Sequence, residues 1–263
     1  MLPNPVKEQI RTGQVSLGTW ISIGHPDVAE ILGGLGFDWL LLDMEHGPLS
    51  ISTVHAMMQA MGGSATQPFV RVATNDAVQI GQVLDAGATG VVVPKVQTAD
   101  DARGVVRACR YPPAGERGIG ARRAAAYGRR FQEYVRDAEA QILIAVQIET
   151  VRSVENVEEI LATPGIDAAF LGPGDLSADL GCFKDRQSPA FVAAIDRVLA
   201  SCGKHGVAPC MAYVPGPDEA LAFIDRGFRM IGMGEDVALL GRAAADVQKV
   251  RERCGSGRYL DAQ

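Results

Sequence analysis

Short apolar runs alternate with segments of helical periodicity along almost the whole chain. The helical segments place apolar residues at i, i+3 and i+4 spacing, as at Ile80, Val83 and Leu84. Several end in a glycine that can adopt the left-handed conformation of a helix C-cap. The apolar runs have the length of buried strands and cover Val15–Ile21, Trp39–Asp43, Phe69–Val72, Gly90–Val93, Ile142–Ile148, Ala168–Leu171, Val207–Met211 and Met230–Met233.

Eight strands, each followed by a helix, predict a closed parallel (β/α)8 barrel rather than an open sheet. The length of 263 residues is typical of one such barrel. Hydrophobic residues make up 47% of the chain and aromatic residues only 6%, which suits parallel strands buried on both faces. We find no shift in composition that would mark a second domain, so a single barrel domain is expected over residues 1–263.

Two segments depart from this alternation. A helix before the first strand is expected to cap the bottom of the barrel. Residues Tyr111 to Tyr127 form a Pro/Gly/Arg-rich insertion after the fourth helix, followed by an extra helix to about Ala140. A basic loop on the catalytic side of a barrel is a candidate lid or anion clamp. A solvated surface loop or a subunit contact would show the same pattern, and both interpretations stay open.

Charge and cysteine content restrict the possible partners. The net charge is −6 and the charged residues are scattered, which argues against a nucleic-acid surface or a basic membrane-binding helix. Five cysteines without short, regular spacing argue against a disulfide framework and against a CxxC zinc site. No apolar run reaches membrane-spanning length, and the N-terminus lacks the apolar region of a signal peptide. We therefore expect a soluble, cytoplasmic protein.

Active sites of such barrels lie at the C-terminal ends of the strands. Glu149 follows the fifth strand and Asp175 follows the sixth. Two carboxylates from adjacent strands, with positions left for water or substrate, suit a hard cation such as Mg²⁺ or Mn²⁺. Alternatively, each carboxylate caps the helix that follows it. The turn Gly172–Gly174 would let backbone N–H groups approach a carboxylate or phosphate closely.

Two further strand ends carry reactive side chains. His46 follows the second strand, with Asp43 close enough in the chain to orient its ring, and an Asp-supported imidazole is a common general acid–base pair. Arg71 lies in the third strand and points over the barrel mouth if the side chains alternate as expected. A buried arginine needs an anionic ligand or a carboxylate neighbour, for which Asp43, Glu45 and Asp85 are candidates.

Several motifs occur in a fixed order along the chain: "LLLDMEHGP", "PFVRV", "VVVPKV", "VQIET" and "FLGPGDLSADLG". Together they resemble the HpcH/HpaI aldolases, which are class II pyruvate aldolases. The resemblance extends from "LGTW" at Leu17–Trp20 to "IGMGED" at Ile231–Asp236. Each motif alone is a weak indication, whereas their combination at barrel spacing is specific.

The resemblance implies an activity and a role for each matching position. The reaction would be the reversible cleavage of 4-hydroxy-2-oxo acids to pyruvate and an aldehyde, with Mg²⁺, Mn²⁺ or Co²⁺ bound by Glu149 and Asp175. His46 would be the acid–base with Asp43 as its partner, and Arg71 would contact the pyruvate end. The remaining residues of the pyruvate pocket would be Trp20, Gln147, Gly172, Pro173 and Gly174.

The resemblance also implies a homo-oligomer, a hexamer or trimer whose barrels exchange C-terminal helices. Asp85 and the pair Arg122–Arg123 would then reach a neighbouring site. At the end of the seventh strand, Ala212 stands where we expect an aliphatic side chain facing the aldehyde. Its small size leaves space, so we expect a broad or bulky aldehyde acceptor.

Other activities are compatible with the same residues. An oxaloacetate decarboxylase shares the enolate intermediate, and a CoA-ester lyase would need a basic CoA site, for which only the pairs Arg122–Arg123 and Arg129–Arg130 are available. Lys95 could form a Schiff base, although lysines at strand ends are common. A non-catalytic protein that binds a metal and a keto acid would have no need of a histidine supported by an aspartate.

Overall fold

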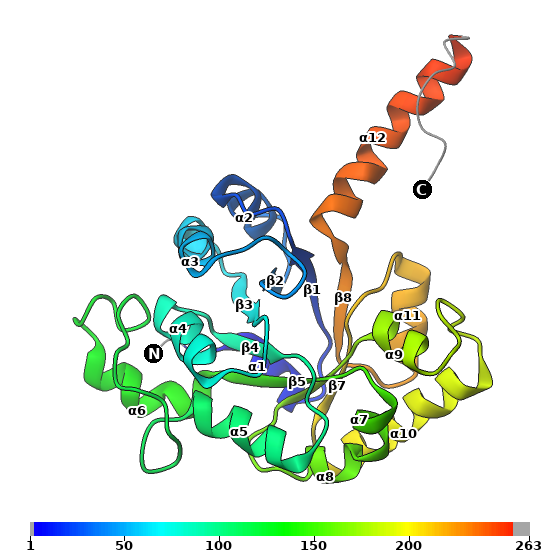
Figure 1. Ribbon diagram of the computed structural model, residues 1–263. Helices are drawn as coiled ribbons and strands as arrows, with labels where there is room; N and C mark the ends of the chain where they lie inside the picture. Colours follow the sequence, from blue (N-terminus) through cyan, green and yellow to red (C-terminus); the bar gives the residue numbers. More distant parts are fainter. Residues whose placement is uncertain (1–2, 255–263) are drawn as a thin grey trace.

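The computed structural model describes residues 3–254, and its eight parallel strands close into one barrel in chain order (Figure 1). Closure is made by β1 and β8, with Ser16 opposite Met230 and Leu17 opposite Ile231. The predicted closed eight-stranded barrel is thus confirmed. The strands are β1 (Ser16–Ile21), β2 (Trp39–Asp43), β3 (Gln67–Arg71), β4 (Gly90–Val93), β5 (Leu143–Ile148), β6 (Ala168–Leu171), β7 (Ala208–Met211) and β8 (Met230–Glu235).

Helices surround the barrel and connect successive strands (Figure 1). A short 3-10 helix, η1 (Met61–Gly63), follows the third of them. The α-helices are α1 (Pro5–Arg11), α2 (Pro26–Gly33), α3 (Ile51–Ala60), α4 (Ala77–Ala86), α5 (Ala99–Cys109), α6 (Phe131–Gln141), α7 (Val151–Glu155), α8 (Val157–Leu161), α9 (Pro173–Asp179), α10 (Pro189–His205), α11 (Pro217–Asp225) and α12 (Asp236–Arg253). The assignment of residues 1–263 to a single domain stays a prediction, because residues 1–2 and 255–263 lie outside the described part.

The predicted strand boundaries differ from the observed ones mainly in β3 and β8. Strand β3 begins at Gln67, although Pro68 has no N–H to donate. The carbonyl of Pro68 still accepts a hydrogen bond from the N–H of Thr89, so the ladder continues through the proline. Strand β8 continues to Glu235, beyond its apolar run. This extension brings a carboxylate to the catalytic end of the barrel.

The barrel interior is filled by a few large rings and many small side chains. The Trp39 ring lies 6.0 Å from the rings of both Phe69 and Phe170, stacked on the first and edge-on to the second. Val6 and Ile10 of α1 belong to the same buried cluster, so α1 closes the lower end of the barrel. Asn4 holds α1 in place because its side-chain amide donates to the carbonyl of Thr89, 2.9 Å away.

The insertion between α5 and α6 is anchored by a buried arginine. Arg117 has no exposed side-chain surface and pairs with Asp85 of α4 at 2.6 Å. Its guanidinium also lies 4.6 Å from the centre of the Tyr111 ring and donates to the hydroxyl of Tyr134. Within the insertion, Arg123 donates to backbone carbonyls of α3 and α4. These two arginines therefore fix the insertion to its own barrel within this chain.

The connection from β8 to α12 is fixed to the residues that follow β1. The buried carboxylate of Asp236 accepts hydrogen bonds from the backbone N–H groups of Ser22 and Ile23 and from the Ser22 hydroxyl. Beyond this residue α12 projects away from the barrel (Figure 1), and none of its other residues is buried. Among residues 3–254, no helix is long and apolar enough to cross a membrane.

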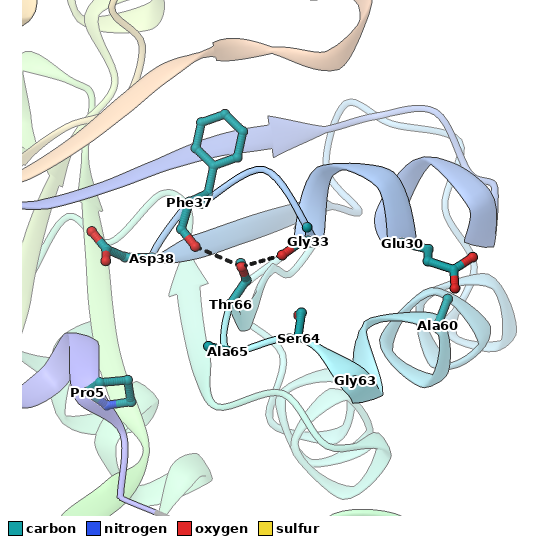
Figure 2. Close-up of a pocket in the computed structure, with 12 residues that line it drawn as sticks. Pro5, Glu30, Gly33, Phe37, Asp38, Ala60, Gly63, Ser64, Ala65 and Thr66 are labelled. Atoms are coloured by element: carbon teal, nitrogen blue, oxygen red, sulfur yellow. Dashed lines mark hydrogen bonds between the residues drawn. The ribbon is translucent and has the colours of Figure 1, made fainter.

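A hollow of about 740 Å³ lies at the other end of the barrel, between α1, the end of α2 and the residues that precede β2 and β3 (Figure 2). Its buried hydroxyl, that of Thr66, donates to the carbonyls of Gly33 and Phe37 at 2.9 and 2.7 Å. Asp38 accepts from the N–H of Leu17 at 2.7 Å. The polar groups of this hollow thus tie loops together.

Candidate active site

A cavity of about 270 Å³ opens at the C-terminal ends of the strands. It collects the residues expected there from the sequence, except Glu149, which lies beneath the surface beside Gln147 and Gly172. The lining residues are Trp20, Asp43, His46, Arg71, Gln147, Gly172, Pro173, Gly174, Asp175, Arg186, Ala212, Tyr213 and Glu235. Residues from seven of the eight strand ends therefore meet in one small volume.

Asp43 and Arg71 form a two-pronged ion pair at the base of this cavity. The Asp43 carboxylate accepts from Arg71 Nε at 2.8 Å and from Nη2 at 2.7 Å, and each side chain is only 7% exposed. The β2–β3 register places the two residues directly opposite each other. The carboxylate neighbour that the buried arginine required is therefore present, and the pairing is bidentate.

The structure corrects the expected relation between Asp43 and His46. The Asp43 carboxylate accepts from the backbone N–H groups of Glu45 and His46, at 3.0 and 3.3 Å, and its two oxygens are engaged by Arg71. The His46 ring instead lies 3.9 Å from the Glu45 carboxylate, and its side chain is 63% exposed. Asp43 thus orients the backbone that carries His46 rather than the imidazole itself.

Glu45 is a buried second carboxylate beside Arg71. Its Oε2 lies 3.1 Å from Arg71 Nη1, in an ion pair without the alignment of a hydrogen bond. Burial raises the pKa of Glu45, the Arg71 charge opposes this shift, and the charge of Glu149 adds to it. On the other side of Arg71, the guanidinium lies 4.3 Å from the centre of the Trp20 ring. Arg71 is therefore held between two carboxylates and an aromatic face.

Glu149 is buried and firmly oriented. One of its oxygens accepts from the backbone N–H of Lys95 at 2.8 Å, and the other accepts from the side-chain amide of Gln147. The hypothesis that Glu149 caps the next helix is wrong, because Thr150 caps α7 by accepting from the N–H of Ser153. The oxygen of the Gln147 amide is buried and has no hydrogen-bond partner in the described part of the chain. A polar group entering from the cavity would satisfy it.

Asp175 is exposed, and its carboxylate forms no side-chain hydrogen bond within residues 3–254. It lies in the first turn of α9, directly after the Gly172–Gly174 turn. A Cβ atom at Gly172 would lie 3.0 Å from the Cβ of Glu149 and 3.1 Å from the Gln147 amide nitrogen. Glycine at this position therefore lets the turn approach Glu149 closely.

No group of three or more His, Cys, Asp or Glu side chains is placed to hold a metal in residues 3–254. The expected site has only two protein carboxylates, Glu149 and Asp175, with the remaining positions left to substrate and water. Their oxygens are the donors that hard divalent cations prefer. The donor set therefore fits such a cation.

Three lining residues were not expected as site residues from the sequence. Arg186 comes from the segment between α9 and α10 and pairs with Glu219 at 2.6 Å. Tyr213 follows β7, and Glu235 ends β8. Tyr213 and Glu235 could have been selected by their position at strand ends, whereas no local pattern marks Arg186. Burial raises the pKa of Glu235, and the charges of Asp236 and Asp43 add to this shift.

A family model described as HpcH/HpaI aldolase/citrate lyase matches residues 16–243. The chain belongs to the HpcH/HpaI family. This match covers every strand of the barrel and every lining residue of the cavity. The family that the sequence motifs indicated is therefore confirmed.

Two relatives of this HpcH/HpaI protein are named as aldolases. A 4-hydroxy-2-oxovalerate aldolase of Novosphingobium aromaticivorans is 43% identical over 256 residues, which is 95% of each chain. A 4-hydroxy-2-oxo-heptane-1,7-dioate aldolase of Escherichia coli is 40% identical over 244 residues, which is 92% of this chain and 93% of the relative. These names agree with the carbon–carbon lyase class and the pyruvate aldolase activity expected from the sequence.

Solved structures show the same fold. A HpcH/HpaI aldolase/citrate lyase family protein from Burkholderia cenocepacia superposes with a TM-score of 0.90 at 37% identity, covering 94% of this chain and 99% of that one. The citrate lyase beta subunit from M. tuberculosis, solved with oxaloacetate and magnesium, has a TM-score of 0.55 at 16% identity, covering 86% of this chain and 93% of that one. The second comparison shows only that the fold is shared.

The ion pair at the base of the cavity generates a stability prediction. Asp43→Asn is expected to lower the free energy of unfolding by about 3 kcal/mol, because it leaves a buried arginine with an incomplete partner. The double variant Asp43→Leu/Arg71→Met is expected to recover only part of that loss, since it removes both charges of this pair but leaves the buried Glu45 carboxylate without Arg71. Urea unfolding of each variant measures these differences.

Asp100→Asn is the matched control for Asp43→Asn. Asp100 pairs with Arg103 on an exposed helix surface, where such pairs contribute at most about 1 kcal/mol. A loss in Asp43→Asn no larger than that in Asp100→Asn would show that the Asp43–Arg71 pair does not support the fold.

Proposed function

We propose that this protein is a metal-dependent pyruvate aldolase that reversibly cleaves 4-hydroxy-2-oxo acids to pyruvate and an aldehyde. The observation that carries the proposal is the convergence of the Asp175 carboxylate, a fixed arginine and an accessible histidine on one small cavity, with the oriented carboxylate of Glu149 buried directly beside Gly172 of its wall. The names of the two aldolase relatives support the substrate class. The small volume of the cavity suits small-molecule substrates.

Glu149 and Asp175 are the proposed ligands of a divalent cation, Mg²⁺, Mn²⁺ or Co²⁺. The unpartnered oxygen of Gln147 and the close approach of Gly172 to Glu149 support a polar ligand at this position. When bound, the cation supplies Lewis-acid stabilisation of the negative charge that develops on the keto oxygen of the substrate. Lys95 and Gln147 hold the Glu149 carboxylate by hydrogen bonds, so little reorganisation accompanies binding.

Arg71 and the Gly172–Gly174 turn are proposed to bind the pyruvate half of the substrate. Arg71 is held by Asp43, Glu45 and the Trp20 ring before any substrate arrives. A cation that is already oriented stabilises developing charge without a reorganisation cost. In the turn, the N–H of Gly172 donates to the carbonyl of Ile148 and Pro173 has none, so the N–H of Gly174 in the first turn of α9 is the one proposed to meet the substrate carboxylate.

His46 is the proposed acid–base. In the cleavage direction its neutral imidazole accepts the proton of the C4 hydroxyl. The electron pair of that O–H bond forms the aldehyde carbonyl, and the C3–C4 bond breaks to leave the enolate of pyruvate. The protonated imidazole then returns its proton to C3. Asp43 places the backbone of His46, and the Glu45 carboxylate lies 3.9 Å from its ring.

The alternative reactions receive less support from the geometry. Lys95 does not line the cavity and its side chain is 69% exposed, so nothing desolvates the amine as a Schiff-base lysine requires. Of the arginines considered for CoA, Arg123 bonds to Met58 and Ala86, and Arg130 pairs with Glu133. Decarboxylation of oxaloacetate uses the same enolate and fits the site as a side reaction.

We further propose that the protein is a homo-oligomer, a trimer or hexamer. Four large apolar side chains of α12 are 45–61% exposed: Val237, Leu240, Val247 and Val250. A helix that carries such side chains and projects from its own barrel needs a second surface to cover them. Light scattering coupled to size-exclusion chromatography should give a mass that is a multiple of three chains, and a monomer would contradict this proposal.

Removing the metal should abolish the activity. Treatment with EDTA is expected to reduce pyruvate release from 4-hydroxy-2-oxo acids to background, and Mn²⁺, Mg²⁺ or Co²⁺ should restore it. Glu149→Gln and Asp175→Asn should each lose Mn²⁺ binding measured by calorimetry, whereas Asp246→Asn, an exposed residue of α12, should retain it. Full activity in EDTA would direct attention to Lys95 and to trapping with borohydride.

Replacing the proposed base should slow the chemical step. His46→Ala is expected to lower kcat by about 10²–10⁴-fold, the usual contribution of a general base. Single-turnover measurements of pyruvate release test this, with His205→Ala as the control because that ring bonds to Glu158 away from the cavity. An unchanged kcat in His46→Ala would remove this residue from the mechanism.

A further inference from the structure

Glu235 is a carboxylate in the cavity wall to which the mechanism above assigns no role. It ends β8, lines the cavity and is half-buried. Within residues 3–254 its carboxylate forms no hydrogen bond or ion pair. The carboxylate of its neighbour Asp236, in contrast, accepts hydrogen bonds from Ser22 and Ile23. A partly buried carboxylate without a partner is costly unless a ligand or water satisfies it.

The barrel order determines which half of the substrate Glu235 faces. The register places Glu235 opposite Trp20 of β1, and β1 also pairs with β2, which leads to His46. Ala212, which is expected to face the aldehyde, follows β7, the neighbour of β8 in the barrel. Under the proposed function, the carbon that bears the C4 hydroxyl lies next to His46. The part of the substrate that leaves as the aldehyde therefore lies along the wall between Ala212 and His46, which includes Glu235.

Both arginine side chains that line the cavity form ion pairs with carboxylates other than Glu235. Arg186 pairs with Glu219 at 2.6 Å, and Arg71 pairs with Asp43 and Glu45. Arg71 and the proposed metal ion serve the pyruvate half, and residues 3–254 place no further unpaired arginine or lysine in the cavity wall, so a second carboxylate beside Glu235 would meet a like charge without a counter-ion. A hydroxyl group, in contrast, can donate a hydrogen bond to the Glu235 carboxylate or accept one from its protonated form.

We propose that Glu235 selects the aldehyde: it binds a hydroxyl group of an uncharged hydroxyaldehyde and disfavours aldehydes that carry a carboxylate. The inference rests on the proposed aldolase function. The substrates in the names of the two relatives differ in the charge of the part that leaves as the aldehyde. The heptane-1,7-dioate carries a second carboxylate there, whereas the valerate has only the carboxylate of its keto-acid end. Because of the Glu235 carboxylate, we expect this protein to use an uncharged aldehyde as its acceptor.

Aldol addition to pyruvate, measured with Mn²⁺ as kcat/KM for each aldehyde, tests the proposal. Two pairs of equal carbon number separate the effects: glyceraldehyde with propanal for the hydroxyl groups, and succinic semialdehyde with butanal for the carboxylate. The wild-type protein should favour glyceraldehyde over propanal and butanal over succinic semialdehyde, each by about tenfold. Ratios within one variant cancel any general loss of activity.

Two variants remove different properties of Glu235. Glu235→Gln keeps a hydrogen-bonding side chain and removes its charge. The ratio of kcat/KM for butanal to that for succinic semialdehyde should therefore fall about tenfold, and the ratio for glyceraldehyde to propanal should be unchanged. Glu235→Leu removes both properties, so both preferences should be lost. Glu30→Gln, which makes the same change of charge on α2 by the hollow at the other end of the barrel, should leave both ratios as in the wild type.

The outcomes separate this inference from the function on which it rests. Metal-dependent addition with ratios that Glu235→Gln and Glu235→Leu leave unchanged would overturn the role of Glu235 and leave the aldolase function standing. A wild-type preference for succinic semialdehyde over butanal would do the same. Failure of the wild-type protein to add pyruvate to any of the four aldehydes would overturn both proposals.

Discussion

The bidentate pair of Asp43 and Arg71 is the interaction on which the catalytic end of the barrel depends. It joins the ends of β2 and β3 in direct register. Through its backbone contacts Asp43 also determines where Glu45 and His46 lie. Arg71, the proposed substrate-binding cation, and His46, the proposed base, are therefore positioned by one carboxylate, both of whose oxygens are engaged by Arg71.

Burial divides the acidic residues of the site into two classes. Asp43, Glu45 and Glu149 are nearly inaccessible, and basic or amide groups hold them in position. Asp175 and Glu235 reach the cavity without a side-chain partner among residues 3–254. The first class is oriented by the protein before any ligand arrives, and it includes the proposed cation ligand Glu149, whereas the second class reaches the cavity with unengaged oxygen atoms. This division explains how a cavity with a large acidic component remains stable while it keeps oxygen atoms free for substrate and cation.

The sequence predicted the barrel well because its signals are local. Each strand is a short apolar run between segments of helical periodicity, several of which end in a capping glycine, so β2, β4 and β6 were predicted at their observed bounds. For the site, the sequence predicted which residues gather at the strand ends, but it did not determine which of their side chains contact one another. The proximity of Asp43 and His46 in the chain suggested a catalytic pair, whereas the partner of Asp43 is decided by register across two strands. Arg186 enters the cavity from a loop with no periodic signal.

The buried carboxylate of Asp236 has a mechanical consequence. It clamps the start of α12 to the end of β1, and the residue immediately before it is Glu235 in the cavity wall. Leu239 also packs against the barrel core and Arg242 donates to the carbonyl of Pro215, so the first turns of α12 are held to the barrel and only the later turns project from it. A surface that covers these later turns is therefore connected to the cavity wall through a continuous, anchored stretch of backbone that ends at Glu235.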